Sequence, residues 1–257
     1  MSAPRLLVVQ VCDEDGPGRL GDWLRDAGLE LDVVRVDNGE PVPGLDGYDG
    51  LLMLGGHQAA YDPPEVSPEL VGVRELLRAA VRRQVPTVAV CLGGQLLAQA
   101  LGGTVRVAVD GPELGAHLVA KKDVAAADPL FSTVPFTPDV IQWHYDEIAL
   151  LPAGAVLLAS SPRYANQAFR VGSCAWGVQF HIETTPEMVA IWAAGDHGRA
   201  ADWGLDVDVA LARAVAVHDD VAEVWTPVAQ RFADIVRAFA ETGQAPSAAA
   251  VPSPAHW

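Results

Sequence analysis

The residue best suited to nucleophilic chemistry is Cys91, which follows an apolar run and precedes two glycines. Residues 85–90 read Val-Pro-Thr-Val-Ala-Val, typical of a buried strand, and Leu-Gly-Gly-Gln at 92–95 opens a helix-compatible run. A nucleophile at a tight strand-to-helix turn is strained and exposed, and it needs small neighbours such as Ala89 and Gly93. Amides at the start of the helix would stabilise a thiolate. The pattern predicts a cysteine nucleophile; the alternative is a buried structural cysteine.

A thiol nucleophile needs a base, and His181 is the candidate. Residues 176–183 read Trp-Gly-Val-Gln-Phe-His-Ile-Glu, so a strand runs into His181, and Glu183 projects to the same side if the chain stays extended. A carboxylate there can orient the imidazole and stabilise its protonated form. The alternative is a partly exposed histidine with a solvated glutamate. The catalytic interpretation of the pair therefore depends on the presence of the Cys91 motif. No second histidine at helical spacing and no cysteine cluster accompanies it, so no metal site is expected.

Acyl transfer also needs donors for an oxyanion. Leu-Met-Leu at 52–54 ends in Gly55-Gly56, one predicted strand before Cys91. We expect the backbone amides of Gly56 and Leu92 to form the oxyanion hole, although strand-ending glycines are often plain turns.

The elements around these residues alternate between strands and helices. Buried apolar strands are predicted at 6–11, 31–36, 50–54 and 87–90, with an amphipathic helix between the last two. Such alternation predicts a parallel sheet covered on both sides, which binds ligands at the carboxyl ends of its strands.

The rest of the chain changes character. Short strands are predicted at 103–109, 115–121, 139–142, 155–160, 167–171 and 175–180. Thr185-Pro186 opens a helix, and helical sequence resumes at Asp206 with a second start near Pro227. We predict one domain over residues 1–242, with C-terminal helices from about 186, and a disordered tail over 243–257.

Composition excludes several classes of protein. Half of the 257 residues are hydrophobic, and the formal net charge is −16. A chain this acidic repels phosphate backbones, so we expect no nucleic-acid partner. No apolar stretch approaches the roughly 20 residues that cross a bilayer, and no signal peptide is evident, so no membrane partner and a cytoplasmic location are expected.

Three other groups of residues are expected to be structural. Cys12 and Cys174 lack a motif and are expected to be inert, small apolar residues. His144 is expected to bond a backbone carbonyl at a strand end, with a place near a substrate pocket as the alternative. Trp192, Trp203 and Trp225 are expected to serve packing rather than to form a ligand cage.

Together the motifs resemble the class I glutamine amidotransferases, the triad type with Cys, His and Glu. The matching segments are Gly-Gly at 55–56, Cys-Leu-Gly-Gly-Gln at 91–95 and Gly-Val-Gln-Phe-His-Ile-Glu at 177–183. Trp-His-Tyr-Asp at 143–146 is similar to stand-alone members related to the amidotransferase part of GMP synthetase. The resemblance implies a three-layer α/β/α, flavodoxin-like, mostly parallel sheet with helices on both faces.

The resemblance also implies roles. Cys91 would form a thioester with the γ-glutamyl group of glutamine, His181 would move the protons, and Glu183 would orient His181. Gln95 would bind substrate, as would the segment containing Trp143, Tyr145 and Asp146. No cofactor and no metal are implied.

Three positions depart from the family pattern. Ala89 stands where glycine is usual, and Ile182 and His57 stand where proline is usual. None of the three removes a catalytic group.

The resemblance implies an enzyme that cleaves a γ-glutamyl amide and releases ammonia for an unidentified acceptor or a separate synthetase subunit. No phosphate-binding loop occurs in this chain, so a synthetase activity would have to lie elsewhere. One alternative is a γ-glutamyl peptidase acting on glutathione-like or γ-glutamylated compounds. Another is a catalytically idle binding or regulatory subunit. The oligomeric state and the role of the C-terminal helices stay open.

Overall fold

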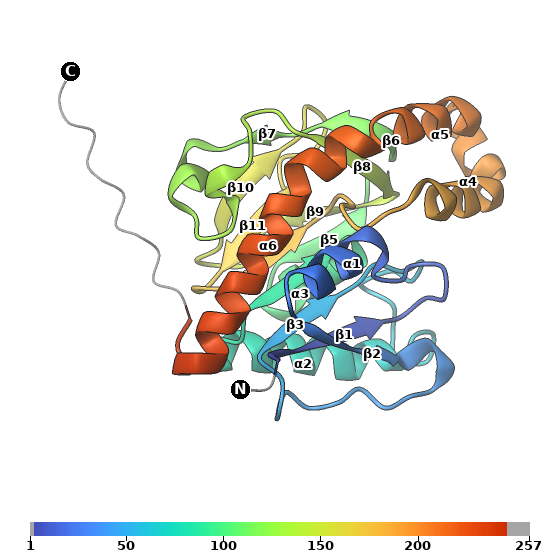
Figure 1. Ribbon diagram of the computed structural model, residues 1–257. Helices are drawn as coiled ribbons and strands as arrows, with labels where there is room; N and C mark the ends of the chain where they lie inside the picture. Colours follow the sequence, from blue (N-terminus) through green and yellow to red (C-terminus); the bar gives the residue numbers. More distant parts are fainter. Residues whose placement is uncertain (1–2, 246–257) are drawn as a thin grey trace, which may run out of the picture.

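An eight-stranded sheet forms the centre of the computed structural model, which describes residues 3–245 (Figure 1). The strand order is β2-β1-β3-β4-β12-β11-β10-β7. The strands of this sheet are β1 (Arg5–Gln10), β2 (Glu30–Arg35), β3 (Gly50–Met53), β4 (Thr87–Val90), β7 (Ala120–Lys121), β10 (Val156–Ser160), β11 (Ala168–Val171) and β12 (Ala175–Val178). Neighbours from β2 to β12 pair in parallel, and β11, β10 and β7 continue the sheet antiparallel.

Helices cover both faces of this sheet. They are α1 (Gly18–Asp26), α2 (Glu69–Arg83), α3 (Leu92–Ala100), α4 (Pro186–Ala201), α5 (Val207–Ala216) and α6 (His218–Thr242). Short 3-10 turns occur at η1 (Val36–Asn38), η2 (Asp123–Ala127) and η3 (Phe131–Thr133). The predicted α/β class, with a mostly parallel sheet between two helical layers, is confirmed.

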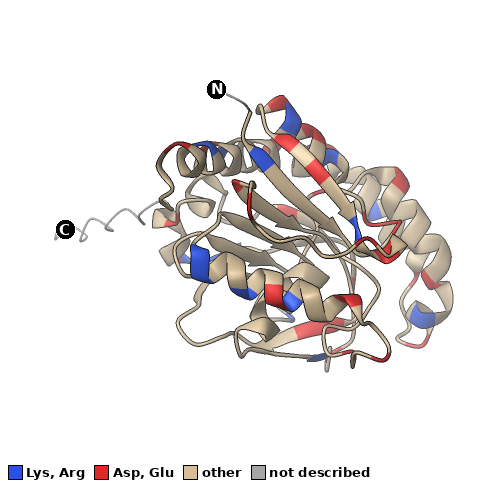
Figure 2. Ribbon diagram, turned by 90° about the horizontal axis from the view of Figure 1, so that it is seen from below, with Lys and Arg blue, Asp and Glu red and all other residues tan. Residues whose placement is uncertain are grey.

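Alternate residues of β1 enter two separate cores. Leu6 and Val8 face the core that α1 and α6 complete, whereas Leu7 and Val9 face the core that α2 and α3 complete. The central strands β3, β4 and β12 carry no charged residue, because both of their faces are buried. In Figure 2 the charged residues lie mainly on the surrounding helices, loops and outer strands.

The central part of the chain differs from the expected strand pattern. The predicted strand at 115–121 is two strands, because the chain passes from one sheet to another at the buried Val119. Its first part pairs with the strand ending at His144 in a separate two-stranded sheet, and β7 joins the main sheet. One strand, β9, was not predicted; it pairs with β5 in a second small sheet. The strands of the small sheets are β5 (Thr104–Val107), β6 (Glu113–Leu118), β8 (Asp139–His144) and β9 (Asp146–Leu150).

Of the helix starts predicted in the C-terminal part, one is confirmed and another is wrong. Thr185 caps α4, since its side chain accepts a hydrogen bond from the Met188 amide. The predicted second start near Pro227 is wrong: α6 runs through Pro227, and the helical stretch breaks at Val217 instead. A proline inside a helix costs about 3 kcal/mol. Burial of Trp225 and other apolar residues of α6 on both sides of the proline offsets that cost.

The predicted tail begins where α6 ends, at Gly243 in a left-handed conformation. Residues 246–257 of that tail lie outside the described part of the chain. Within residues 3–245, no helix has both the length and the apolar character needed to cross a membrane.

Candidate active site

Cys91 occupies a strained turn between β4 and α3. Its φ is 50° and its ψ is −110°, a positive-φ conformation that costs a residue with a side chain about 1–3 kcal/mol. Two hydrogen bonds hold the turn: the Cys91 amide donates to the Val178 carbonyl at 2.8 Å, and the Gln95 amide donates to the Cys91 carbonyl at 2.9 Å. The turn therefore fixes the thiol at the carboxyl ends of β4 and β12.

The two glycines after Cys91 let α3 pack closely against the sheet. A Cβ on Gly93 would lie 2.5 Å from the Met53 carbonyl oxygen, and one on Gly94 would lie 2.6 Å from that of Val178. Larger residues would push the helix away from the ends of β3 and β12. The requirement for small neighbours thus comes from backbone contacts on both sides of the thiol.

His181 and Glu183 follow the end of β12 and form a buried pair. Backbone hydrogen bonds of 2.8 and 3.3 Å between His181 and Ile141 hold the histidine against β8. Nδ1 of His181 donates to Oε1 of Glu183 at 2.6 Å. Oε2 of the same carboxylate accepts a 2.9 Å hydrogen bond from the Ile182 amide. Proline, the residue usual at position 182 in the family, could not donate this bond, so Ile182 adds a restraint on the carboxylate.

Cys91 and His181 face the same small space beside Gly55. A Cβ on Gly55 would lie 3.3 Å from Cε1 of His181 and 3.6 Å from Cβ of Cys91. Nε2 of His181 is buried and has no hydrogen-bond partner among the described residues. Burial lowers the pKa of His181, but the charges of Glu183 and Cys91 raise it, and the pKa ends well above its ordinary value. This geometry suits proton exchange between the imidazole and the thiol.

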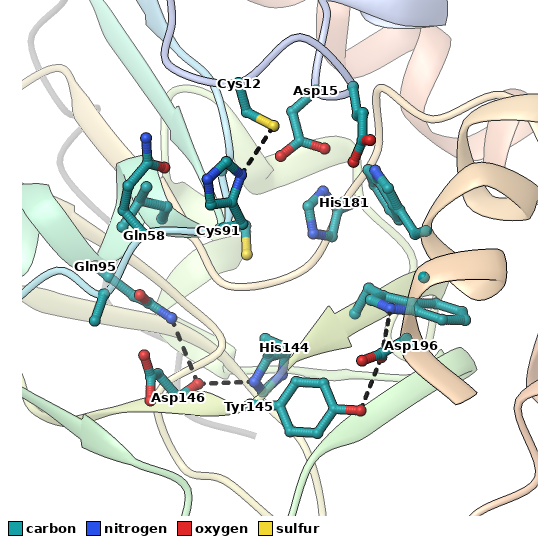
Figure 3. A pocket seen from close by; sticks show the side chains of 18 of the residues that line it. Cys12, Asp15, Gln58, Cys91, Gln95, His144, Tyr145, Asp146, His181 and Asp196 are labelled. Atoms are coloured by element: carbon teal, nitrogen blue, oxygen red, sulfur yellow. Dashed lines mark hydrogen bonds between the residues drawn. The ribbon is translucent and has the colours of Figure 1, made fainter. Parts of the chain in front are cut away.

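A cavity of about 360 Å³ opens over Cys91 and His181 (Figure 3). Its size falls within the range of about 300–1,000 Å³ that is usual for small-molecule sites. Glu183 is not part of the lining and lies behind His181. The predicted oxyanion and substrate residues all line the cavity: Gly56, Leu92, Gln95, Trp143, Tyr145 and Asp146.

Gly56 and Leu92 adjoin each other at this cavity. A Cβ on Gly56 would lie 3.0 Å from Cδ2 of Leu92. Neither backbone amide donates a hydrogen bond to another group in the described part of the chain. Both amides are therefore available to a ligand, as an oxyanion hole requires.

Gln95 contacts Gln179, a residue of the 177–183 segment for which the sequence predicted no role. Its Nε2 donates to Oε1 of Gln179 at 3.2 Å and to the Asp146 carbonyl at 3.4 Å. Nε2 of Gln179 lies 3.8 Å from Sγ of Cys91. A signal for this residue existed, because positions 179 and 181 share one side of an extended chain.

Asp196 and Arg199 are among the residues that helix α4 contributes to the cavity. Asp196 accepts hydrogen bonds from Nε1 of Trp143 at 3.0 Å and from the Tyr145 hydroxyl at 2.8 Å. The guanidinium of Arg199 lies 3.6 Å from the centre of the Tyr145 ring. These contacts fix the orientation of the two aromatic side chains, and no sequence motif marked either α4 residue.

His144 also lines the cavity and is held on both sides of its ring. Nδ1 donates to the Asp146 carbonyl at 2.8 Å, which agrees with the expected hydrogen bond to a backbone carbonyl. Nε2 lies 3.2 Å from Oε2 of the buried Glu113.

Two residues expected to be structural prove to line the cavity. Sγ of Cys12 lies 3.2 Å from Nδ1 of His57, and burial raises the pKa of this thiol to about 11. The ring of Trp192 lies 4.7 Å from that of His181 and 6.3 Å from that of Trp143, so it packs as expected, and it also lines the cavity. Cys174 is buried away from the cavity and donates to the Gln84 carbonyl, as a structural cysteine would.

The described residues contain no group of three or more His, Cys, Asp or Glu side chains that could hold a metal ion. The chemistry that the side chains of this cavity can supply is nucleophilic attack by a thiolate, with an adjacent imidazole to exchange protons.

Comparisons with known proteins agree with this geometry. Residues 19–189 match the family model of class-I glutamine amidotransferases. γ-Glutamyl peptidase 4 of Arabidopsis thaliana is 30% identical over 170 residues, which is 65% of this chain and 66% of that protein. One subunit of the glutamine-hydrolyzing GMP synthase of Archaeoglobus fulgidus is 33% identical over 161 residues, 62% of this chain and 79% of that protein. The crystal structure of a glutamine amidotransferase from Thermotoga maritima matches with a TM-score of 0.80 and 26% identity, over 91% of this chain and 100% of that one. The chain belongs to the class-I glutamine amidotransferase family.

Proposed function

We propose that this protein hydrolyses a γ-glutamyl amide, with glutamine as the leading substrate, through a thioester on Cys91. The observation that carries the proposal is the imidazole of His181, which faces the same space as Cys91: its buried Nε2 has no hydrogen-bond partner among the described residues, while Nδ1 is held by Glu183. A base with one nitrogen fixed and the other free beside a thiol is the arrangement that nucleophilic catalysis needs.

In the first half of the reaction, Nε2 of His181 takes the Cys91 proton and the sulfur attacks the γ-carbonyl carbon. The amides of Gly56 and Leu92 stabilise the negative charge on the carbonyl oxygen. The C–N bond then breaks as the imidazolium returns its proton to the leaving nitrogen, which departs as ammonia. A thioester remains on Cys91.

In the second half, Nε2 of His181 takes a proton from water and the resulting hydroxide attacks the thioester. The C–S bond breaks, glutamate leaves, and the proton returns to the sulfur. Glu183 stabilises the imidazolium each time it forms, because its carboxylate accepts the Nδ1 proton in a hydrogen bond.

The γ-glutamyl part of the substrate binds on the side of Cys91 that carries Gln95, Tyr145 and Asp146. Figure 3 shows these side chains on the opposite side of Cys91 and His181 from Cys12 and Asp15. The hydrogen bonds of Gln95 to Gln179 and to the Asp146 carbonyl give this side a fixed polar surface.

The released ammonia then serves an acceptor or a separate synthetase subunit. The similarity to one subunit of a glutamine-hydrolyzing GMP synthase supports a partner of that kind. The similarity to γ-glutamyl peptidase 4 supports a second candidate, hydrolysis of γ-glutamylated peptides. Both candidates use the same thioester and differ only in the group that leaves.

Glutamate release from glutamine and from γ-glutamyl peptides tests the proposal. The Cys91→Ala and Cys91→Ser variants should lose this activity, whereas Cys174→Ser, a change at a buried thiol outside the cavity, should keep it. Full activity in a Cys91 variant would refute the thioester. A large preference for peptides over glutamine would favour the second candidate. Failure of Cys91 to react with a glutamine-analogue electrophile, alone and with candidate partners, would favour a catalytically idle protein.

A further inference from the structure

Asp15 is a buried carboxylate that the proposed mechanism does not use. It follows β1, lines the cavity, and is only 7% exposed. Among the described residues, the side chain that acts as a hydrogen-bond donor toward this carboxylate is Trp192. One neutral donor leaves most acceptor sites of a buried carboxylate unused, so a ligand N–H beside the thiol would satisfy it further.

The position of Asp15 relative to the reacting groups is well defined. A Cβ on Gly55 would lie 3.7 Å from Oδ2 of Asp15, beside the Cys91 and His181 atoms that approach the same point. Figure 3 shows Asp15 and Cys12 on the side of His181 that faces away from Gln95 and Asp146. If the γ-glutamyl part lies against Gln95, the leaving group extends toward Asp15.

The charged residues that line the cavity are mostly acidic. The carboxylates that line the cavity are Glu14, Asp15, Asp146 and Asp196, and the only lysine or arginine among its described lining residues is Arg199. Arg199 lies over the ring of Tyr145, which Figure 3 shows on the other side of Cys91 and His181 from Asp15. A leaving group with its own carboxylate would therefore meet Asp15 with no lysine or arginine beside it among the described lining residues.

We propose that Asp15 determines which leaving amine the enzyme accepts: ammonia and amines that carry a positive charge are favoured over amines that carry a carboxylate. The carboxylate of Asp15 accepts an N–H from the leaving nitrogen or from a nearby ammonium, and it repels an anionic leaving group. This inference rests on the proposed hydrolysis of γ-glutamyl amides. The inference predicts that glutamine and γ-glutamyl polyamines are substrates and that γ-glutamyl amino acids are poor ones.

Asp15 carries its charge at neutral and alkaline pH. Burial raises its pKa to about 6, while the charge of His181 lowers it and that of Glu183 raises it. The titratable or polar groups that face Asp15 are Cys12 and Glu14 from its own segment, His181 and Glu183 from the segment after β12, and Trp192 from α4.

The test compares kcat/KM for three amides by the release of glutamate, at about pH 8 where Asp15 is ionised. The amides are glutamine, γ-glutamyl ethylenediamine, whose leaving group carries an ammonium, and γ-glutamylglycine, whose leaving group carries a carboxylate. The last two have leaving groups of nearly equal length. Asp15→Asn removes the charge with little change in shape, and Asp13→Asn is the matched control, because Asp13 is exposed and pairs with Arg35.

The wild-type enzyme should prefer γ-glutamyl ethylenediamine over γ-glutamylglycine by about tenfold or more. Asp15→Asn should bring this ratio close to one, and Asp13→Asn should leave it unchanged. The wild-type ratio should also fall as the pH drops below about 6, a readout that needs no variant.

A wild-type preference for γ-glutamylglycine would overturn the inference. An equal loss of kcat/KM for all three amides in Asp15→Asn would also overturn it. That result would mean that Asp15 binds the shared γ-glutamyl part of the substrates or stabilises the fold. If wild-type protein releases glutamate from none of the amides and forms no Cys91 adduct, the proposed function fails and this inference fails with it.

Discussion

Nδ1 of His181 lies 2.6 Å from Oε1 of Glu183, and both side chains are almost wholly buried. The carboxylate is held by the Ile182 amide at its other oxygen, so it cannot rotate freely away from the imidazole. This pairing leaves Nε2 as the only ring nitrogen that can exchange a proton with Cys91.

Replacing Glu183 by Gln should reduce kcat by about 10²- to 10⁴-fold, because the imidazolium loses its stabilising charge and its fixed orientation. Glu183 raises the pKa of His181, so the variant should have a lower His181 pKa. The acidic limb of the pH profile, where His181 becomes protonated and can no longer take the Cys91 proton, should consequently move to lower pH. Steady-state kinetics across the pH range measure both effects.

Urea unfolding shows whether the Glu183→Gln protein is folded, and Glu187→Gln is the matched control because Glu187 lies on the exposed start of α4. An unchanged pH profile in a folded Glu183→Gln protein would mean that Glu183 does not act through His181.

Gly94→Ala should destabilise the protein by about 1–3 kcal/mol, because the new Cβ would lie 2.6 Å from the Val178 carbonyl oxygen. Activity should fall as well, since the same contact sets the position of α3 behind Cys91. Gly198→Ala is the control: Gly198 lies in α4 with open space around it, and alanine there should stabilise the helix by up to about 1 kcal/mol. Urea denaturation gives both free energies. Equal values for the two variants would contradict the packing explanation.

Asp15→Asn should stabilise the folded protein at alkaline pH, although it impairs specificity. The pKa of Asp15 rises from 3.8 to about 6 on folding, so the folded state binds this proton more tightly than the unfolded state. The contribution of Asp15 to the free energy of unfolding is therefore most favourable at low pH, where the carboxyl group is protonated. That contribution is lost as the pH rises from about 4 to about 6. At about pH 8 the variant should gain at most about 3 kcal/mol, and at about pH 4 the gain should vanish. A gain independent of pH would show that the carboxylate is not titrating in this range.

The strands and the Cys91 turn were predictable because their signals are local. Buried parallel strands are continuously apolar, and a nucleophile turn needs glycines at fixed positions, so Cys91 with its flanking residues could be identified from adjacent letters. The His181–Glu183 pair was predictable for the same reason, since two residues of an extended chain share a side.

Other features depend on tertiary packing and leave no local signal. Trp192 and Asp196 line the cavity because they lie on the face of α4 that packs toward β8. The hydrophobic periodicity of the sequence does not specify which face this is. Asp15 stands in a loop, where an acidic residue is normally solvated, and it is buried by segments distant in the sequence, among them the residues around His181 and helix α4. Helix α6 continues through Pro227 because burial of its apolar face outweighs the local preference for a break.

The most direct test of the account is intact-protein mass spectrometry after brief exposure to glutamine or another γ-glutamyl amide and rapid acid quenching. A γ-glutamyl adduct on Cys91 is expected in the wild-type, Cys12→Ser and Cys174→Ser proteins, and no adduct is expected in Cys91→Ser. Turnover of these amides with no adduct on Cys91, or with an adduct on Cys12 instead, would contradict it.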